Sequence, residues 1–297
     1  MEIVTAGKGW LDIDAYGAMI AYAELLRLLG REAVAVSSVE PNDSVTKSLR
    51  GFDEIRRDYV PAENDSFIVL DVSDPENFDP IIDTRRVTEV IDHHPGYEEY
   101  WKEKIGDGAE ILSIGAVCTL IYEKWRDAGL LSEMRKSSAT LLAAGILDNT
   151  LNFGAKITAE RDKQAFSSLL KIGGLGEEFV AEYFSGVQKG IEADICRAVK
   201  DDLKIASLGG WGEKIRFGQI AVWDGERILP EFVKQDSKFD FMNFINVSGK
   251  HSFFIASDEK IKNFFEELLG IRFEGNVARA ERLWLRKEII RESLGKK

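Results

Sequence analysis

An aspartate followed by two histidines, Asp92, His93 and His94, comes directly after the apolar run Val87–Ile91. The chain has three histidines in 297 residues, so two of them are concentrated here. Pro95 then ends the strand. Once the backbone turns, one imidazole can bind a metal while the other faces a substrate. The alternative is a strand end with a polar turn, but acids after other strands favour a metal site.

Two aspartates, Asp12 and Asp14, separate the apolar segment Ile3–Thr5 from a helix predicted to run from Ala15 to Gly30. One aspartate can cap the helix and interact with its dipole. Two anions separated by a single residue repel each other unless a cation lies between them. The spacing therefore favours metal binding over simple capping.

Two further aspartates end apolar segments. Asp71 follows the continuously apolar run Ser66–Leu70, which is typical of a strand buried on both faces. Because the carboxyl ends of parallel strands lie along one edge, Asp71 should approach the histidines there. Asp148 follows the apolar segment Leu141–Leu147, where a cation would offset the cost of burying its charge. A capping or turn role for Asp148 is equally compatible with the pattern.

The order of apolar segments predicts an α/β protein with two domains. Residues 1–190 should form a mainly parallel sheet with helices on both faces, and residues 191–297 a smaller α/β domain. Strands are predicted at 3–5, 33–36, 66–70, 87–91, 204–208, 215–223 and 251–256. Further helices are predicted at 113–128, 133–146, 158–170 (with Thr158 as the cap), 177–199, 258–269 and 277–294.

The charge balance limits the function classes. With 39 basic and 51 acidic residues the net charge is −12, which argues against general nucleic-acid or membrane binding. A small anionic substrate would therefore need local cations or metals. Cys118 and Cys196 are too few for a disulfide framework, and no apolar run reaches membrane-spanning length. We expect a cytoplasmic protein.

Taken together, these motifs resemble the DHH phosphoesterase superfamily, and are most similar to manganese-dependent family II inorganic pyrophosphatases and the exopolyphosphatase and prune group. The resemblance implies that Asp71 bridges two metals, that Asp92 orients a histidine and that His94 contacts the substrate. It implies these metal ligands: Asp12, Asp14, Asp71, His93 and Asp148.

The C-terminal part resembles the DHHA2 domain of those enzymes. Lys204, in Asp202-Leu203-Lys204, is similar to a phosphate-contacting lysine, and Arg286-Lys287 resembles part of a Ser-Arg-Lys-Lys signature. Arg279 is an alternative match to the signature arginine. A solvated helix face is the other reading of Arg286-Lys287. Cations on a separate domain would imply closure over the substrate.

Lys8 departs from the pyrophosphatase pattern, which has a metal-binding histidine at this position. A protonated lysine cannot donate a lone pair to a metal. One metal position should then be altered, emptied or partly replaced by the Lys8 ammonium, which could also contact the substrate.

The resemblance implies hydrolysis of phosphoanhydride bonds, in particular of inorganic pyrophosphate. Two Mn²⁺ ions about 3.5–4 Å apart would activate water and hold phosphoryl oxygens, with Mg²⁺ or Co²⁺ as alternatives. Other readings are an exopolyphosphatase, another short-polyphosphate or nucleotide phosphoesterase, or a catalytically weak binding or regulatory protein. The resemblance also implies a homodimer. The third histidine, His251, fits a hydrogen-bonded core residue.

Overall fold

The computed structural model describes residues 1–235 and 238–295 and divides into two compact units. Unit 1 comprises Met1–Phe153 and Ile157–Val180, and unit 2 comprises Gly154–Lys156 and Ala181–Lys297. The boundary that we predict near residue 190 lies within helix α6 (Phe179–Ala193) and stays a prediction. Among the described residues, no helix has the length and apolarity needed to cross a membrane.

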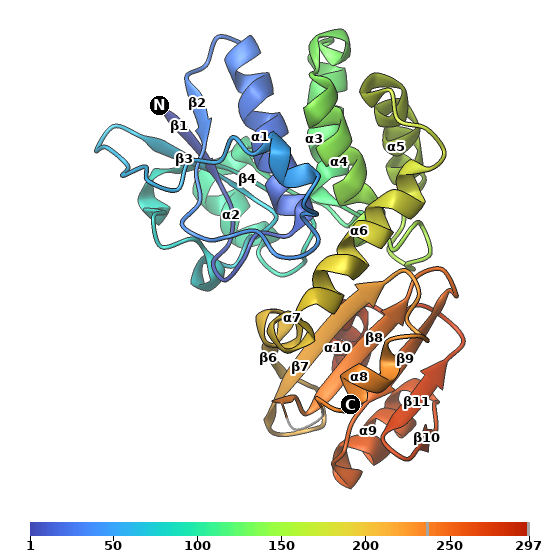
Figure 1. Ribbon diagram of the computed structural model, residues 1–297. Coiled ribbons are helices and arrows are strands. Elements are labelled where there is room, and N and C mark those ends of the chain that lie inside the picture. Colours follow the sequence, from blue (N-terminus) through green and yellow to red (C-terminus); the bar gives the residue numbers. More distant parts are fainter. Residues whose placement is uncertain (236–237, 296–297) are drawn as a thin grey trace. The chain divides into compact units, whose positions relative to one another are not determined.

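Unit 1 is built on a five-stranded sheet in the order β2-β1-β3-β4-β5, and every pair of neighbouring strands is parallel (Figure 1). Its strands are β1 (Glu2–Thr5), β2 (Ala33–Ala35), β3 (Ser66–Leu70), β4 (Val87–Asp92) and β5 (Ala109–Ile111). Its helices are α1 (Ile13–Leu28), α2 (Glu98–Ile105), α3 (Val117–Asp127), α4 (Lys136–Asn149) and α5 (Glu160–Gly173).

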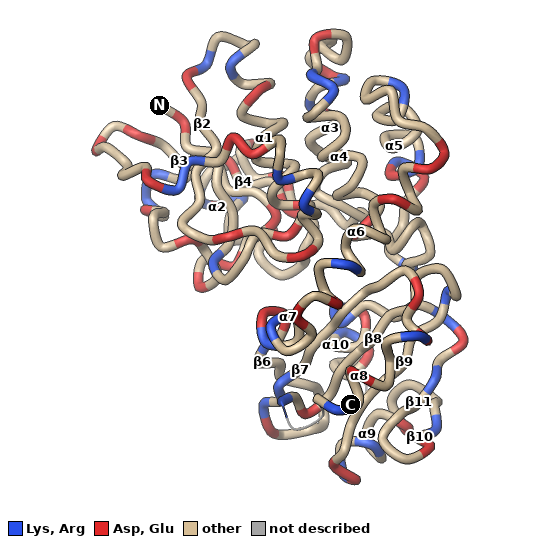
Figure 2. The backbone as a smooth tube through the Cα atoms, in the orientation of Figure 1, with Lys and Arg blue, Asp and Glu red and all other residues tan. Residues whose placement is uncertain are grey.

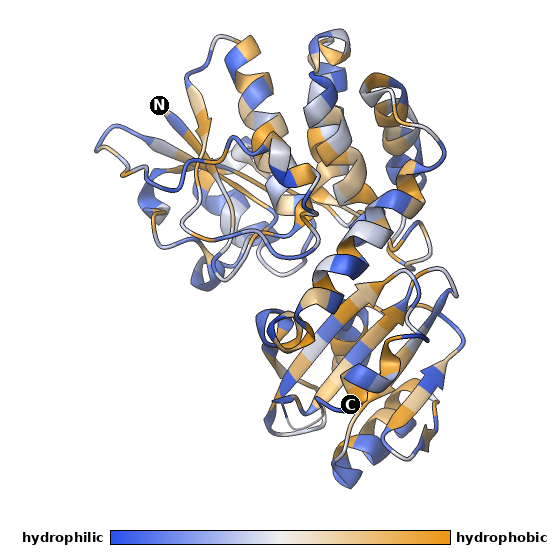
Figure 3. Ribbon diagram, in the orientation of Figure 1, coloured by the Kyte–Doolittle hydropathy of each residue, from blue (hydrophilic) through white to orange (hydrophobic). Residues whose placement is uncertain are grey.

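Helices cover both faces of this sheet. On one face, Trp101 of α2 packs in a buried cluster with Ile3 and Phe67 of the strands. Helices α1 and α3 contact the strands without entering that cluster, which places them on the opposite face. Helix α1 packs so closely against α4 that a Cβ on Gly17 would come within 2.9 Å of the Leu141 carbonyl oxygen. The strands are correspondingly apolar (Figure 3), as a sheet buried on both faces requires.

Unit 2 is built on a six-stranded sheet in the order β10-β11-β9-β8-β7-β6, in which only β7 and β8 are parallel. Its strands are β6 (Lys204–Ser207), β7 (Lys214–Val222), β8 (Phe241–Asn246), β9 (His251–Ile255), β10 (Phe273–Glu274) and β11 (Val277–Ala280). Its further helices are α7 (Ile195–Asp202), α8 (Leu229–Val233), α9 (Glu259–Leu269) and α10 (Arg286–Gly295).

An aromatic core fixes helices α9 and α10 on one face of the second sheet. The rings of Phe241 and Phe265 are stacked with centroids 3.4 Å apart, and Phe217 and Ile289 belong to the same buried cluster. Strands β8 and β9 carry no Lys, Arg, Asp or Glu (Figure 2), in keeping with their burial along their whole length. The predicted α/β class with a parallel sheet followed by a smaller α/β domain is confirmed.

Three local predictions are wrong. The helix predicted at 177–199 is two helices, because Asp194 has non-helical backbone angles (φ −154°, ψ 82°) and caps α7 by accepting from the Arg197 N–H. The helix predicted at 277–294 begins as strand β11, which pairs with β9, and becomes helical only at Arg286. The cap of α5 is Ala159 and not Thr158. In each case tertiary pairing or a neighbouring side chain outweighs local propensity.

Candidate metal centre

Asp71, His93 and His94 converge at the carboxyl edge of the parallel sheet. Each offers a ligand atom, and these atoms all lie within 4.8 Å of one another. Asp71 comes directly after β3 and has a left-handed backbone with φ of 60°, a conformation that aspartate tolerates better than most residues. Its N–H donates to the Ile91 carbonyl, which ties the turn to β4. The predicted convergence of strand ends thus brings these three side chains together.

The orientation of His93 is set by a backbone contact. Its Nδ1 lies 3.1 Å from the Ile114 carbonyl oxygen, and because a carbonyl only accepts, Nδ1 must carry the hydrogen. Its Nε2 then faces Asp71 Oδ1 at 3.3 Å and Asp14 Oδ2 at 3.9 Å. A lone pair this close to carboxylate oxygens is repelled unless a proton or a cation lies between them. Imidazole nitrogen with carboxylate oxygens suits Mn²⁺, Mg²⁺ or Co²⁺, so the donor set fits the predicted metal.

Asp14 is fully buried in the first turn of α1 and accepts two N–H groups from the first turn of α3. Its carboxylate oxygens lie 2.9 Å from the Val117 nitrogen and 2.8 Å from the Cys118 nitrogen. Burial, together with the charge of Asp12, raises the pKa of Asp14 to about 7. The positive end of α3 and a nearby cation both favour the charged form. Burial also raises the pKa of the Cys118 thiol well above its usual range, so this group stays a neutral neighbour of the site.

Asp92 holds the turn that carries both histidines. Its Oδ1 accepts from the backbone N–H groups of His93 and His94 and lies 2.8 Å from His94 Nδ1. Burial alone would raise the pKa of Asp92, but the contacts with His94 and Ser73 outweigh it and leave the pKa lowered. The His94 side chain is 46% exposed, so its ring can reach a ligand while Asp92 fixes its orientation.

The positions of the other residues predicted for the site do not by themselves indicate metal or substrate binding. Asp12 caps α1 by accepting from the Ala15 N–H, and Asp148 lies half-buried in the last turn of α4. Lys8 is exposed on the loop after β1, where its backbone N–H donates to the Asn77 carbonyl. The cluster of close ligand atoms includes neither Asp12 nor Asp148. The roles of Asp12, Asp148 and Lys8 stay predictions.

Several groups that build the site have no side-chain signature in the sequence. The Ile114 carbonyl and the Val117 and Cys118 N–H groups are backbone atoms. Gly145 is required by close packing, because a Cβ there would lie 2.5 Å from Cys118 Sγ and 3.2 Å from Asp14 Oδ1. Sequence reasoning also does not single out Asp162, which contacts the segment next to the site. Its sequence signal is that of an acid in the first turn of a helix, where the Asp162 carboxylate accepts from the Ala159 N–H.

Comparison with known proteins places this geometry in a family. The DHH family, N-terminal domain, matches residues 2–146, which contain Asp14, Asp71, His93 and His94. The chain carries a DHH-family N-terminal domain. A probable manganese-dependent inorganic pyrophosphatase from Lactobacillus acidophilus is 28% identical over 273 residues, covering 86% of this chain and 86% of the relative.

Two solved structures share the fold of this chain. A candidate family II inorganic pyrophosphatase from Methanococcus jannaschii has a TM-score of 0.72 at 19% identity and covers 99% of both chains. An exopolyphosphatase-related protein from Bacteroides fragilis has a TM-score of 0.55 at 14% identity, covering 99% of this chain and 92% of that chain. At these identities the two structures establish the fold alone.

The cations predicted in unit 2 differ in their surroundings. The Arg286 side chain is 11% exposed, and its guanidinium donates to the carboxylate and carbonyl of Asp202 and to the Phe217 carbonyl. Lys204 is exposed and Lys287 is half-buried. Arg279 lies on β11, where it pairs with Glu226 and Glu281.

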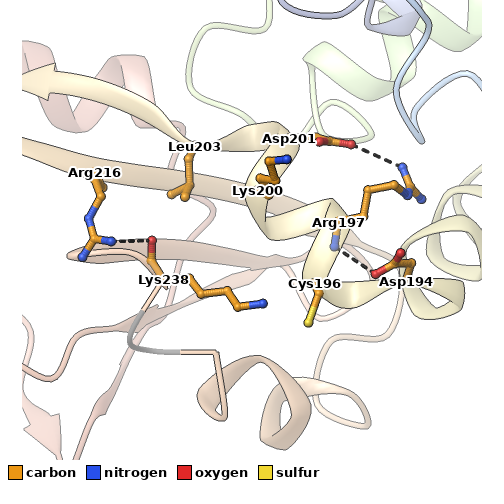
Figure 4. A pocket seen from close by; sticks show the side chains of 8 residues that line it. All are labelled: Asp194, Cys196, Arg197, Lys200, Asp201, Leu203, Arg216 and Lys238. Atoms are coloured by element: carbon orange, nitrogen blue, oxygen red, sulfur yellow. Dashed lines mark hydrogen bonds and ion pairs between the residues drawn. The ribbon is translucent and has the colours of Figure 1, made fainter.

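Unit 2 also contains a pocket of about 650 Å³ beside α7 (Figure 4). Two of its four basic side chains already have acidic partners, because Arg197 pairs with Asp201 and Arg216 pairs with Asp240. The complete lining is Asp194, Cys196, Arg197, Lys200, Asp201, Leu203, Arg216 and Lys238. This lining contains none of the cations predicted to bind phosphate.

His251 has the surroundings expected of a core residue. It is buried on β9, with Nδ1 2.9 Å from the Gly249 carbonyl oxygen and Nε2 3.3 Å from the Asn246 amide nitrogen. Both ring nitrogens therefore have partners within unit 2.

Proposed function

We propose that this chain hydrolyses inorganic pyrophosphate to phosphate with Mn²⁺ as its cofactor. The observation that carries the proposal is the convergence of Asp71, His93 and His94 within 4.8 Å at the carboxyl edge of the sheet. The Lactobacillus acidophilus relative, which matches most of the chain, is named for the same metal and the same reaction.

The residues of the site would have separate roles in the hydrolysis of pyrophosphate. Hydrolysis joins a water oxygen to one phosphorus and breaks the bridging P–O bond, so two phosphate ions form. Divalent cations held by Asp71, His93 and Asp14 would supply positive charge for phosphoryl oxygens and would acidify water. His94, oriented by Asp92, would donate a hydrogen bond to a phosphate oxygen.

The finer assignments belong to the same proposal. We propose Asp12 and Asp148 as further metal ligands, and Lys204, Arg286 and Lys287 as phosphate-binding cations of a DHHA2-like domain. Arg286 contacts Asp202, two residues before the proposed phosphate-binding Lys204, and this neighbourhood favours Arg286 over Arg279 as the match to the signature arginine. The two free cysteines, Cys118 and Cys196, support a reducing, cytoplasmic location. A homodimer is proposed from the resemblance.

Phosphate release tests the function. The full chain, stripped of metal and reloaded with Mn²⁺, Mg²⁺ or Co²⁺, is compared on pyrophosphate, tripolyphosphate and a dinucleotide. Pyrophosphate with Mn²⁺ should be fastest, and Asp71→Asn should abolish the metal-dependent rate. Faster cleavage of tripolyphosphate or the dinucleotide would support the other phosphoesterase readings. Failure to bind Mn²⁺ would support a protein that keeps the fold without the chemistry.

A further inference from the structure

The segment from Ile114 to Thr119 leads from β5 into α3 and supplies three backbone groups to the candidate metal centre. The Ile114 carbonyl accepts from His93 Nδ1, and the Val117 and Cys118 N–H groups donate to Asp14. These three contacts are made by backbone groups, and the Cys118 thiol adds a contact with the Asp14 carbonyl oxygen. The orientation of His93 and Asp14 therefore depends on where this stretch of backbone is held.

The Asp162 carboxylate accepts hydrogen bonds from this segment on both sides of the groups that contact His93 and Asp14. Its Oδ2 accepts from the Gly115 N–H at 3.1 Å, one residue after Ile114. Its Oδ1 accepts from the Thr119 hydroxyl at 2.6 Å, one residue after Cys118. A Cβ on Gly115 would lie 2.5 Å from Asp162 Oδ2, so this approach requires glycine. The carboxylate of α5 thus fixes the short segment at two points.

A capping role alone does not explain this arrangement. Capping α5 uses the contact of Asp162 Oδ2 with the Ala159 N–H at 2.7 Å, and a cap normally lies at the surface. Asp162 is instead 0% exposed and has two further partners on the segment from 114 to 119. A fully buried acid is uncommon unless its hydrogen bonds are satisfied, and bonds to a carboxylate are the stronger kind.

We propose that Asp162 is a positioning residue of the metal centre, acting through the backbone of Ile114–Thr119 on His93 and Asp14. The proposal rests on the metal-binding function proposed above. Partners that orient metal ligands typically change metal affinity or activity by about 10- to 100-fold when they are replaced. Loosening the segment should let the His93 ring and the Asp14 carboxylate leave the geometry that a divalent ion needs.

Three variants of the full chain test the proposal. Asp162→Asn keeps one acceptor oxygen for the N–H groups, and its amide can donate to Thr119. Thr119→Val removes a single hydroxyl with little change in shape, so it serves if Asp162→Asn folds poorly. Asp65→Asn is the matched control, because Asp65 is a buried aspartate that accepts from the Tyr59 hydroxyl and the Ala62 N–H at the amino end of β3.

The readouts are Mn²⁺ affinity, from the paramagnetic resonance signal of free Mn²⁺, and the visible absorption of bound Co²⁺, with apo-protein stability measured in parallel. Asp162→Asn and Thr119→Val should weaken Mn²⁺ binding by about tenfold or more and shift the Co²⁺ bands. Asp65→Asn should lower stability without either change. Parent-like Mn²⁺ binding and Co²⁺ bands in both test variants, or equal changes in Asp65→Asn, would overturn the role of Asp162. A parent chain that binds no Mn²⁺ would overturn the proposed function as well.

Discussion

His93 Nδ1 lies 3.1 Å from the carbonyl oxygen of Ile114, and this contact determines which ring nitrogen faces the carboxylates of the site. Because Nδ1 carries the hydrogen, Nε2 presents its lone pair towards Asp71 and Asp14. The imidazole is thus oriented for a metal by a backbone atom 21 residues further along the chain.

Replacing His93 should remove metal binding without unfolding unit 2. His93→Ala is expected to weaken Mn²⁺ binding by more than about 100-fold, since a direct ligand should matter at least as much as an outer partner. The measurement is calorimetric titration with Mn²⁺ together with phosphate release. His251→Gln is the control, because His251 is a buried histidine bonded only within unit 2. If His93→Ala keeps parent affinity, His93 is not a ligand.

Gly145 should be sensitive to a single added methyl group. In Gly145→Ala the new Cβ would meet Cys118 Sγ and the backbone of Asp14, so we expect a loss of about 1–3 kcal/mol in stability and weaker Mn²⁺ binding. Denaturant unfolding and Mn²⁺ titration measure the two effects. Gly218→Ala is the matched control, because its Cβ would lie 2.5 Å from the terminal methyl carbon (Cε) of Met242 in unit 2. Equal Mn²⁺ affinity in the two variants would contradict the expectation.

The sequence was informative where function depends on side chains at the ends of buried parallel strands. An apolar run such as Ser66–Leu70 can be recognised as a buried strand, and the common edge of a parallel sheet then brings Asp71 towards His93 and His94. The same reasoning cannot reveal the Ile114 carbonyl, because every residue has one. It also leaves Asp162 undistinguished from other acids in a first helical turn until the fold brings Gly115 and Thr119 to it.

Boundaries were less predictable in unit 2, where pairing partners are distant in the chain. The segment Val277–Ala280 is followed by a sequence with helical character, and we therefore predict a helix that begins at Val277. The segment instead forms β11, because the edge of β9 is available for pairing. Strand β8 (Phe241–Asn246) escaped prediction because its apolar and amide side chains do not alternate, although all six residues are buried between β7 and β9.

Lys8 offers a gain-of-function prediction. Lys8→His places a neutral imidazole where the family II pattern has a metal ligand, so one Mn²⁺ ion should bind about tenfold more tightly, equivalent to about 1.4 kcal/mol. Competition with a chelator measures the affinity of each site. Lys8→Gln is the control, because it removes the charge without adding a good ligand. Equal affinities for the histidine and glutamine variants would exclude this position from the metal centre.

Arg286 should contribute both to the stability of unit 2 and to substrate binding. Its guanidinium donates to Asp202 and to the Phe217 carbonyl, and a lysine ammonium cannot reproduce this set of contacts. Arg286→Lys is therefore expected to lower the free energy of unfolding by about 2 kcal/mol, typical of hydrogen bonds to a charged group, and to raise the KM for pyrophosphate. Thermal unfolding and steady-state kinetics measure these effects.

The matched variant Arg279→Lys decides between the two candidate signature arginines. Arg279 is about half-exposed and pairs with Glu226 and Glu281, and surface pairs contribute only about 0–1 kcal/mol. We expect the stability of the Arg279→Lys variant and its KM for pyrophosphate to stay near those of the parent chain. A raised KM in Arg279→Lys with an unchanged KM in Arg286→Lys would transfer the phosphate-binding role to Arg279 on β11. Arg286 would then have a structural role only, holding Asp202 and, through Asp202, the start of β6.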